Sequence, residues 1–249
     1  MNIFRNLFKK SQPGEPVNLG VLGCDMHSHF IPGIDDGAKT MKDSLELLRG
    51  MEELGYRKVV TTPHIMGDFF RNTPEIISTG LEQVRNAARA EGMKIEIEAA
   101  AEYYFDYEME KKVKAGRLLT FGINYLLFEV SYMNAPDNLD AFIFTLQADG
   151  YKPVLAHPER YPFWFTKNLA NFEKLKDKGV LFQLNLNSLT GHYSPATKKV
   201  AEEMIDKGWY EFAGTDCHHA GHLELLRKVR SEKALRKLVD SGKLLNSTL

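Results

Sequence analysis

The chain has 249 residues, of which 43% are hydrophobic and 26% are charged, and its formal net charge is −1. This length is enough to bury a substantial core, and the composition is ordinary for a globular enzyme. The near-zero charge removes the electrostatic case for a nucleic-acid binder, and no apolar stretch approaches the ~20 residues of a membrane span. Two cysteines, Cys24 and Cys217, do not make a disulfide framework, so we expect a cytoplasmic protein.

Residues 1–19 are predicted to form a flexible tail. Residues 1–10 are basic and amphipathic but lack the apolar region and small-residue cleavage site of a signal peptide; contact with a membrane surface is the alternative. Residues 11–19 are rich in proline, glycine and polar residues, which favours irregular structure. We therefore expect a single folded domain over residues 20–249.

Short apolar strands alternate with longer helical stretches after this tail. The predicted strands cover residues 21–26, 58–62, 95–101, 125–130, 153–157, 180–185 and 211–215. The predicted helices cover residues 40–55, 74–92, 107–116, 137–150, 167–179, 194–208 and 221–239. Seven strand–helix repeats favour an α/β fold with a closed or nearly closed parallel barrel. An open doubly wound sheet is the alternative, although no glycine-rich dinucleotide or phosphate-binding motif supports it.

Histidines and acidic residues follow these predicted strands. Two histidines alternate in Asp25-Met26-His27-Ser28-His29, directly after the first strand, so their side chains point to the same face. His64, His157 and His218 each stand at the end of another strand. Because active sites of parallel barrels lie at the carboxyl ends of the strands, we expect these side chains to meet there.

The candidate ligands suit a hydrolytic centre with two or three metal ions. They are His27, His29, Asp36, His64, Glu102, Glu129, His157, Asp216 and His218. Histidine and carboxylate ligands without a cysteine cluster fit Mn, Fe or Zn in catalysis better than a structural Zn. Glu129 stands in an apolar run, where an unpaired carboxylate would be costly. Asp35-Asp36-Gly37 also has the composition of a simple turn, so ligation and a turn both stay open, and we expect Asp25 to orient His27.

These motifs together resemble the PHP (polymerase and histidinol phosphatase) superfamily, and more narrowly its bacterial capsule-locus tyrosine phosphatases of the CpsB/CapC/YwqE type. The resemblance runs from about residue 21 to 230 and includes Thr62-Pro63-His64, Ala156-His157-Pro158-Glu159-Arg160 and Asp216-x-His218. It implies a distorted (β/α)7 barrel with a trinuclear, usually manganese-supported centre. It also implies removal of phosphate from tyrosine clusters on a partner bacterial tyrosine kinase that controls capsule or exopolysaccharide synthesis.

The resemblance also implies a role for each ligand. One ion would be held by His27, His29, Glu102 and Asp216; a second by His64, Glu129 and His157 with Glu102 bridging; and Asp36 (or Asp35) and His218 would contribute to a third. Arg160 would bind the substrate phosphate. The chain departs from the family pattern at Ile65, where a second histidine is common, and at Gly221-His222-Leu223, where an arginine is often found.

The expected chemistry is hydrolysis of a dianionic phosphomonoester. Arg160 can clamp phosphate oxygens in a bidentate way, and His222 is a candidate acid for the leaving group. A cysteine-dependent phosphatase is excluded because it needs an arginine six residues after its cysteine, whereas Phe30 and Leu223 stand there. The alternatives are a small-molecule phosphatase of the histidinol-phosphate kind and a metal-binding regulatory scaffold.

An aromatic loop follows Arg160 in the sequence, with four aromatic side chains in Tyr161-Pro162-Phe163-Trp164-Phe165. Loops seldom bury so many large apolar residues. We therefore expect this loop to receive a peptide or a neighbouring protein subunit.

Overall fold

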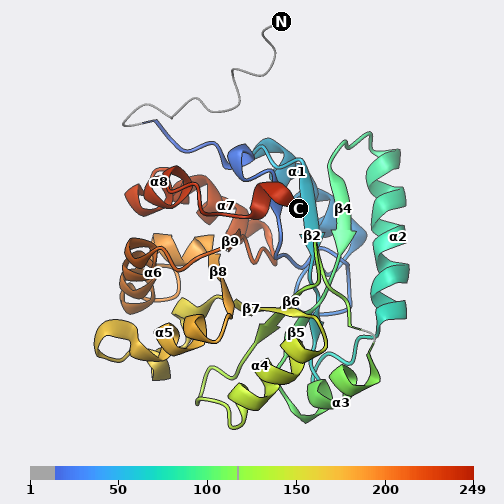
Figure 1. Cartoon of the computed structure of the whole chain (residues 1–249). Coiled ribbons are helices and arrows are strands. Elements are labelled where there is room, and N and C mark those ends of the chain that lie inside the picture. Colours follow the sequence, from blue (N-terminus) through green and yellow to red (C-terminus); the bar gives the residue numbers. More distant parts are fainter. Residues whose placement is uncertain (1–14, 117) are drawn as a thin grey trace, which may run out of the picture.

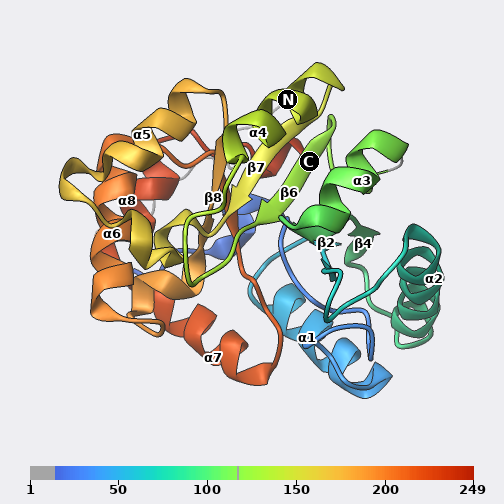
Figure 2. The same ribbon diagram turned by 90° about the horizontal axis from the view of Figure 1, so that it is seen from below.

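The computed structural model describes residues 15–116 and 118–249. Within this part, parallel strands form the centre and helices surround them, as Figures 1 and 2 show from two directions. None of the described helices is long and apolar enough to cross a membrane.

The strands form two parallel sheets. The smaller contains β1 (Cys24–Asp25), β2 (Lys58–Thr61) and β4 (Glu96–Ala99), in that order. The larger contains β3 (His64–Ile65), β5 (Glu102–Tyr104), β6 (Tyr125–Glu129), β7 (Lys152–Ala156), β8 (Leu181–Asn185) and β9 (Phe212–Gly214). The strands predicted over residues 58–62 and 95–101 correspond to β2 and β4 of the smaller sheet. The short strands β3 and β5 of the larger sheet were not predicted; β3 begins after Pro63, which has no N–H for the ladder, and β5 begins after Ala100 and Ala101.

The first and last strand regions lie next to each other, so the sheets curve into a distorted barrel. Ser28 forms a parallel bridge with Cys217, and the His29 N–H donates to the Cys217 carbonyl at 3.0 Å. Deeper in the barrel, the carboxylate of Asp25 accepts hydrogen bonds from the Thr215 N–H and hydroxyl at 2.8 and 2.9 Å. These contacts bring both ends of the folded chain into one wall of the site.

The helices follow the strands as predicted, with small differences in their ends. They are α1 (Met41–Glu53), α2 (Pro74–Ala90), α3 (Tyr107–Ala115), α4 (Leu139–Ala148), α5 (Ala170–Asp177), α6 (Pro195–Lys207), α7 (Ala220–Val229) and α8 (Lys233–Asp240). Helix α1 begins with a capping box between Thr40 and Asp43, which satisfies two otherwise unpaired N–H groups. The single helix predicted over residues 221–239 was wrong, because the chain leaves the helical path between α7 and α8.

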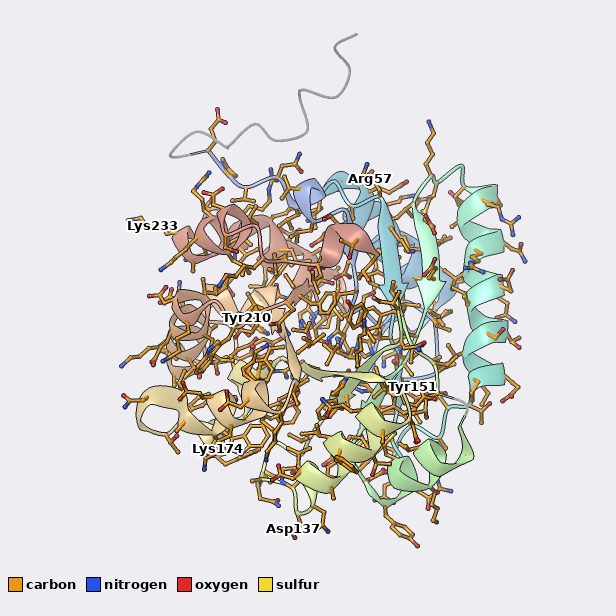
Figure 3. The ribbon with its side chains drawn as sticks, viewed as in Figure 1. Arg57, Asp137, Tyr151, Lys174, Tyr210 and Lys233 are labelled. Carbon is orange, nitrogen blue, oxygen red and sulfur yellow. The ribbon has the colours of Figure 1, made fainter. Side chains whose placement is uncertain are left out.

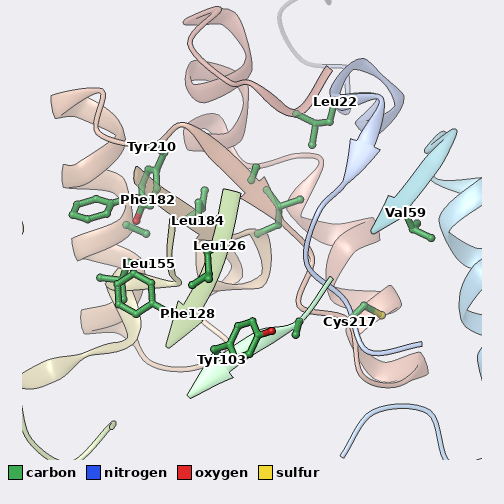
Figure 4. Packing of buried hydrophobic residues seen from close by; sticks show 14 of the residues in the cluster. Leu22, Val59, Tyr103, Leu126, Phe128, Leu155, Phe182, Leu184, Tyr210 and Cys217 are labelled. Carbon is green, nitrogen blue, oxygen red and sulfur yellow. The ribbon is translucent and has the colours of Figure 1, made fainter. Parts of the chain in front are cut away.

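The central strands are buried on both faces, which is typical of parallel barrels. One cluster lies inside the barrel and includes Met26, Leu127, Val154 and Phe212. Side chains that alternate with these along the strands, such as Leu126, Phe128 and Leu155, belong to the cluster that packs against the helices (Figure 4).

The chain termini also take part in packing. Val17 and Leu19 are buried, so packing begins at Val17, within the predicted tail of residues 1–19. Residues 1–14 of that tail lie outside the described residues. At the other end, the buried Asn246 side chain accepts from the Ala213 N–H and donates to the carbonyls of Cys24 and Ala213. The C-terminal segment thereby joins β1 to β9.

Candidate metal centre

All nine predicted ligands lie at one end of the barrel. His27 and His29 follow β1, His64 begins β3, Glu102 begins β5, and Glu129 ends β6. His157 follows β7, Asp216 and His218 follow β9, and Asp36 lies in the connection between β1 and α1. A cavity of about 650 Å3 opens above this group. The strand ends thus gather imidazoles and carboxylates from distant parts of the sequence.

One group lies at the buried floor and consists of His27, His29, Glu102 and Asp216. His27 Nε2 is 3.1 Å from Glu102 Oε2 and 3.3 Å from Asp216 Oδ1. His29 Nε2 is 3.5 Å from each of the same two oxygen atoms. Two imidazole nitrogens and two carboxylate oxygens therefore converge on one point.

A second group shares Glu102 and extends toward β6. His64 Nδ1 lies 3.3 Å from Glu102 Oε2 and 3.2 Å from Glu129 Oε1, yet this buried nitrogen makes no hydrogen bond. His157 Nε2 approaches the other oxygen of Glu102, Oε1, at 3.1 Å. Glu102 therefore lies between the two groups and could bridge two ions.

A third group lies nearer the surface. Asp36 Oδ1 is 3.5 Å from His64 Nε2 and 3.3 Å from His218 Nε2, and His29 completes this group. Asp35, the alternative ligand, instead accepts from His29 Nδ1 at 2.9 Å and from the His64 N–H at 3.2 Å. The two adjacent aspartates thus differ: Asp36 faces the cluster and Asp35 orients a histidine.

Several imidazoles are held so that one nitrogen is free to bind a metal. Gln183 Oε1 lies 2.9 Å from His27 Nδ1 and also accepts from the His157 N–H, so His27 carries its proton on Nδ1. The Asp35 carboxylate likewise accepts from Nδ1 of His29, and the Asp216 carbonyl accepts from Nδ1 of His218 at 2.9 Å. The Nε2 lone pairs then point into the cluster, as in metal sites where a second partner fixes the ligating imidazole.

The electrostatics of the cluster favour positive charge. Burial alone would lower the pKa of His64, but the nearby carboxylates of Glu102 and Glu129 raise it to about 9. The pKa of His29 is raised well above its usual value, since Asp35 and other carboxylates outweigh the same burial effect. Conversely, the pKa of Asp216 is held well below its usual range by His27 and His218 despite burial.

Backbone strain marks two of these positions. His157 and Asp216 have φ angles of 35° and 49°, a left-handed conformation that is uncommon outside glycine. Such strain persists where the surroundings impose it, and it concentrates at functional sites.

Arg160 lies beside the cluster and is held by aromatic and acidic partners. Its Nη1 is 2.9 Å from Asp216 Oδ2. The guanidinium carbon lies 4.1 Å from the ring centre of Tyr193 and 4.9 Å from that of Tyr132, within the range of cation–π attraction. Asn185 Nδ2 donates to both the Tyr193 hydroxyl and Asp216 Oδ2, each at 2.8 Å. Arg160 is thus fixed in the wall of the cavity.

Glu159, the neighbour of Arg160, stabilises this wall of the cavity through three buried hydrogen bonds. Its Oε1 accepts from the Asn185 N–H at 3.0 Å and the Ser188 hydroxyl at 2.7 Å, and its Oε2 accepts from the Tyr210 hydroxyl at 3.0 Å. Figure 3 shows Tyr210 in the interior, whereas Lys174 and Lys233 lie at the periphery. This carboxylate connects the segment after β7 to the segment after β8.

His222 lines the cavity but is poorly suited to donate a proton. Its Nδ1 accepts from the His218 N–H at 3.2 Å. Burial and the neighbouring His219 lower its pKa to about 4, so it is neutral near pH 7. This arrangement favours support of His218 over the acid role expected from the sequence.

Two expectations from the sequence were wrong. Asp25 does not orient His27, because its carboxylate bonds to Thr215 and Gln183 holds the imidazole. The aromatic loop after Arg160 is not an exposed surface: Tyr161 and Trp164 are buried, and the two phenylalanines are half-buried against the core.

Sequence reasoning also missed contributions from Gln183, Tyr132 and Tyr193. A glutamine in the apolar strand Leu181–Asn185 was an available signal, because a buried amide needs partners. The two tyrosines had no comparable signal.

The donor set passes a chemical test for metal binding. Oxygen and imidazole ligands without thiolates suit divalent ions such as Mn, Fe or Zn. The buried His64 Nδ1 makes no hydrogen bond, and the Nε2 atoms of His27 and His29 face the carboxylates of Glu102 and Asp216. The cluster is therefore able to hold metal ions.

Comparisons with known proteins agree with this geometry. A family model described as capsular polysaccharide synthesis, CpsB/CapC, matches residues 23–238. Tyrosine-protein phosphatase YwqE of Bacillus subtilis is 27% identical over 196 residues, which cover 78% of this chain and 77% of YwqE. The putative tyrosine-protein phosphatase CapC of Staphylococcus aureus is 27% identical over 197 residues, covering 78% of this chain and 76% of CapC.

Solved structures confirm the predicted distorted barrel. A structure from work on YwqE of Bacillus subtilis and CpsB of Streptococcus pneumoniae, described as metal-dependent tyrosine phosphatases, matches with a TM-score of 0.77 at 24% identity. The match covers 90% of this chain and 94% of the other. A histidinol phosphate phosphatase from Lactococcus lactis matches with a TM-score of 0.52 at 12% identity, covering 85% of this chain and 93% of the other. At these identities the two matches show a shared fold.

Proposed function

This chain belongs to the CpsB/CapC family, and we propose that it is a metal-dependent protein-tyrosine phosphatase. The observation that carries the proposal is the convergence of three His and carboxylate groups on Glu102, Asp36 and Asp216, with Arg160 fixed beside them. Relatives named as tyrosine-protein phosphatases, matched over more than three quarters of their length, support the same activity.

We assign the nine candidate ligands to two or three ions, with Mn²⁺ as the expected metal and Fe or Zn as alternatives. His27, His29, Glu102 and Asp216 form the floor site, and His64, Glu129 and His157 share Glu102 in the second. Asp36 and His218 contribute to the third. Three overlapping groups of facing ligand atoms support this division for eight of the nine residues. His157 is assigned to the second ion because its Nε2 lies 3.1 Å from Glu102 Oε1.

Metal ions held by these residues would offset the charge of the phosphomonoester and would lower the pKa of a bound water toward about 7. Arg160 presents its guanidinium to the phosphate in the planar geometry that phosphate oxygens match. Asp216 and the rings of Tyr132 and Tyr193 hold that guanidinium in place, which reduces the ordering required when substrate binds. A tyrosine leaving group has a pKa near 10, so it needs less protonation than an alkoxide does.

The cysteines take no part in this chemistry. Burial and nearby carboxylates raise the pKa of Cys24 to about 12 and that of Cys217 well above its usual value. A thiolate, the nucleophilic form, is therefore disfavoured at both positions.

We further propose that the substrate is a phosphotyrosine-containing protein in the cytoplasm, namely a bacterial tyrosine kinase that controls capsule or exopolysaccharide synthesis. The family description, capsular polysaccharide synthesis, supports this setting.

The test is phosphate release by the full chain loaded with Mn²⁺, from a phosphotyrosine peptide and from histidinol phosphate. We expect turnover of the peptide to dominate. Arg160→Ala should lower kcat/KM on the peptide by about 100-fold or more while the bound metal is unchanged. Arg227→Ala is the matched control, because this exposed arginine pairs with Glu53 and Glu224 away from the cavity.

Preference for histidinol phosphate would assign the chain to small-molecule phosphatases. Absence of turnover with metal demonstrably bound would favour a regulatory scaffold. Equal activity of the Arg160→Ala and Arg227→Ala proteins would refute the role of Arg160.

A further inference from the structure

Two large apolar side chains stand exposed on loops at the cavity: Met133 lines it, and Phe69 lies in a turn between the lining residues Met66 and Phe70. Phe69 is 73% exposed and Met133 is 87% exposed, although most other large apolar residues of the described chain are buried. We call these two residues the apolar rim. Exposed apolar groups beside a binding cavity are typical of interaction surfaces.

Phe69 lies in a hydrogen-bonded turn that exposes its side chain to solvent. Met66 and Phe70 exchange two backbone hydrogen bonds of 2.9 Å, which place Phe69 at the tip between them. The Gly67 N–H donates to Asp106 Oδ2 at 3.0 Å, which ties the turn to the start of α3. The ring of Phe70 stacks on the imidazole of His64 at 5.5 Å. This hydrogen-bonded turn therefore connects the exposed Phe69 to the candidate metal ligand His64.

Met133 belongs to the loop that leaves the candidate ligand Glu129. Its neighbour Tyr132 stacks on His157 at 5.9 Å and lies under Arg160, and Met133 itself lines the cavity. Residues 131–136 carry no charged side chain. This loop presents a flexible thioether, which adapts to different apolar surfaces.

The burial of the cavity walls indicates how a substrate would lie. The floor ligands His27, His29 and Glu102 are fully buried, whereas Tyr132 is partly exposed and the apolar rim is open to solvent. The phosphate of a phosphotyrosine must reach the ligands at the floor, so its ring would lie beside the aromatic side chains that line the cavity, such as Tyr132 and Tyr193. The backbone that bears it then emerges at the mouth, next to Phe69 and Met133.

We propose that the apolar rim binds apolar residues adjacent to the phosphotyrosine and so makes this site selective for a polypeptide over a free aryl phosphate. The inference rests on the proposed phosphatase function. The occupant is an uncharged, apolar stretch of the substrate protein, because the loop of residues 131–136 offers no charge to pair with acidic or basic flanks.

The test uses the full chain with Mn²⁺ and three substrates: a phosphotyrosine peptide flanked by leucines, the same peptide flanked by serines, and p-nitrophenyl phosphate. The variant is Phe69→Ala combined with Met133→Ala. Its matched control combines Phe144→Ala, on α4 and also 73% exposed, with Ile123→Ala, 66% exposed; neither residue stands on a segment that contributes to the cavity lining.

We expect the rim variant to lose about tenfold in kcat/KM on the leucine peptide, equivalent to ~1.4 kcal/mol. The loss should lie mainly in KM, and turnover of p-nitrophenyl phosphate should stay within about twofold of the original protein. The wild-type preference for the leucine over the serine peptide should disappear, and the control should behave as wild type.

Equal turnover of the leucine peptide by the rim and control variants would overturn the inference. So would a parallel loss on p-nitrophenyl phosphate, because that would indicate damage to the catalytic centre. If the unmodified protein hydrolyses none of the three substrates, the proposed function itself fails.

Discussion

Replacing Glu159 with glutamine should make folding less sensitive to pH between about 4.5 and 7. Burial raises the pKa of Glu159 from 4.5 to about 7, although hydrogen bonds from Ser188, Asn185 and Tyr210 partly oppose the shift. Glutamine preserves the shape of the side chain. Its oxygen can accept from Asn185 and Ser188, and the Tyr210 hydroxyl can turn to accept from its amide.

The direction in which the stability of the wild-type protein changes with pH follows from proton linkage. A carboxyl group with a raised folded-state pKa binds its proton more tightly in the folded protein, so its contribution to stability is fully present below pH 4.5 and declines until about pH 7. The difference between 4.5 and about 7 corresponds to about 3 kcal/mol at 1.36 kcal/mol for each pKa unit. Glutamine has no proton to release, so wild-type stability should fall relative to the variant by up to about this amount.

The assay is urea unfolding of both proteins, stripped of metal by a chelator, at pH values from 4.5 to 7.5. Titration of the ligand cluster and of Asp25, whose pKa burial raises to about 7, is common to both proteins and cancels in the difference. A difference in unfolding free energy that does not change with pH would refute the reasoning. A change of opposite sign would mean that the hydrogen bonds outweigh burial.

Three further predictions follow from other contacts. Asn246→Ala removes three buried hydrogen bonds that join the C-terminal segment to β1 and β9, and it should lower the free energy of unfolding by about 3 kcal/mol. The control Asn134→Ala, at an exposed position, should change the free energy of unfolding little. Equal urea midpoints for the two variants would contradict this prediction. Cys217→Ala should keep most phosphatase activity because the thiol is not the nucleophile, and loss of activity with unchanged metal content would contradict the assignment. Tyr193→Ala should lower kcat/KM on a phosphotyrosine peptide about fivefold, because ~1 kcal/mol of cation–π attraction to Arg160 is lost. Tyr193→Phe keeps the ring and should retain most of the wild-type kcat/KM. An equal loss in Tyr193→Phe would assign the effect to the hydroxyl instead of the ring.

The gathering of candidate ligands could be predicted because each depends on a local pattern. His27, His64, His157 and Asp216 each follow a short apolar run, and parallel topology alone places such strand ends together. The same locality explains the correct order of strands and helices.

What could not be predicted depends on contacts between distant residues. Gln183 orients His27 across 156 positions of sequence, whereas the nearer Asp25 turns to Thr215 instead. The aromatic loop after Arg160 is largely buried because Trp164 packs against Phe172, and no local pattern reveals such a partner. Conversely, no local pattern marks Met133, and only the fold shows that this exposed side chain lines the cavity.

The most direct test of the metal-dependent mechanism is phosphate release from a phosphotyrosine peptide by metal-stripped protein, before and after addition of Mn²⁺. The bound metal is counted in the same samples. We predict negligible release without metal and recovery that follows occupancy of two to three ions per chain. Full activity in the stripped protein would contradict the assignment of His27, Glu102, Asp216 and their neighbours as the centre of catalysis.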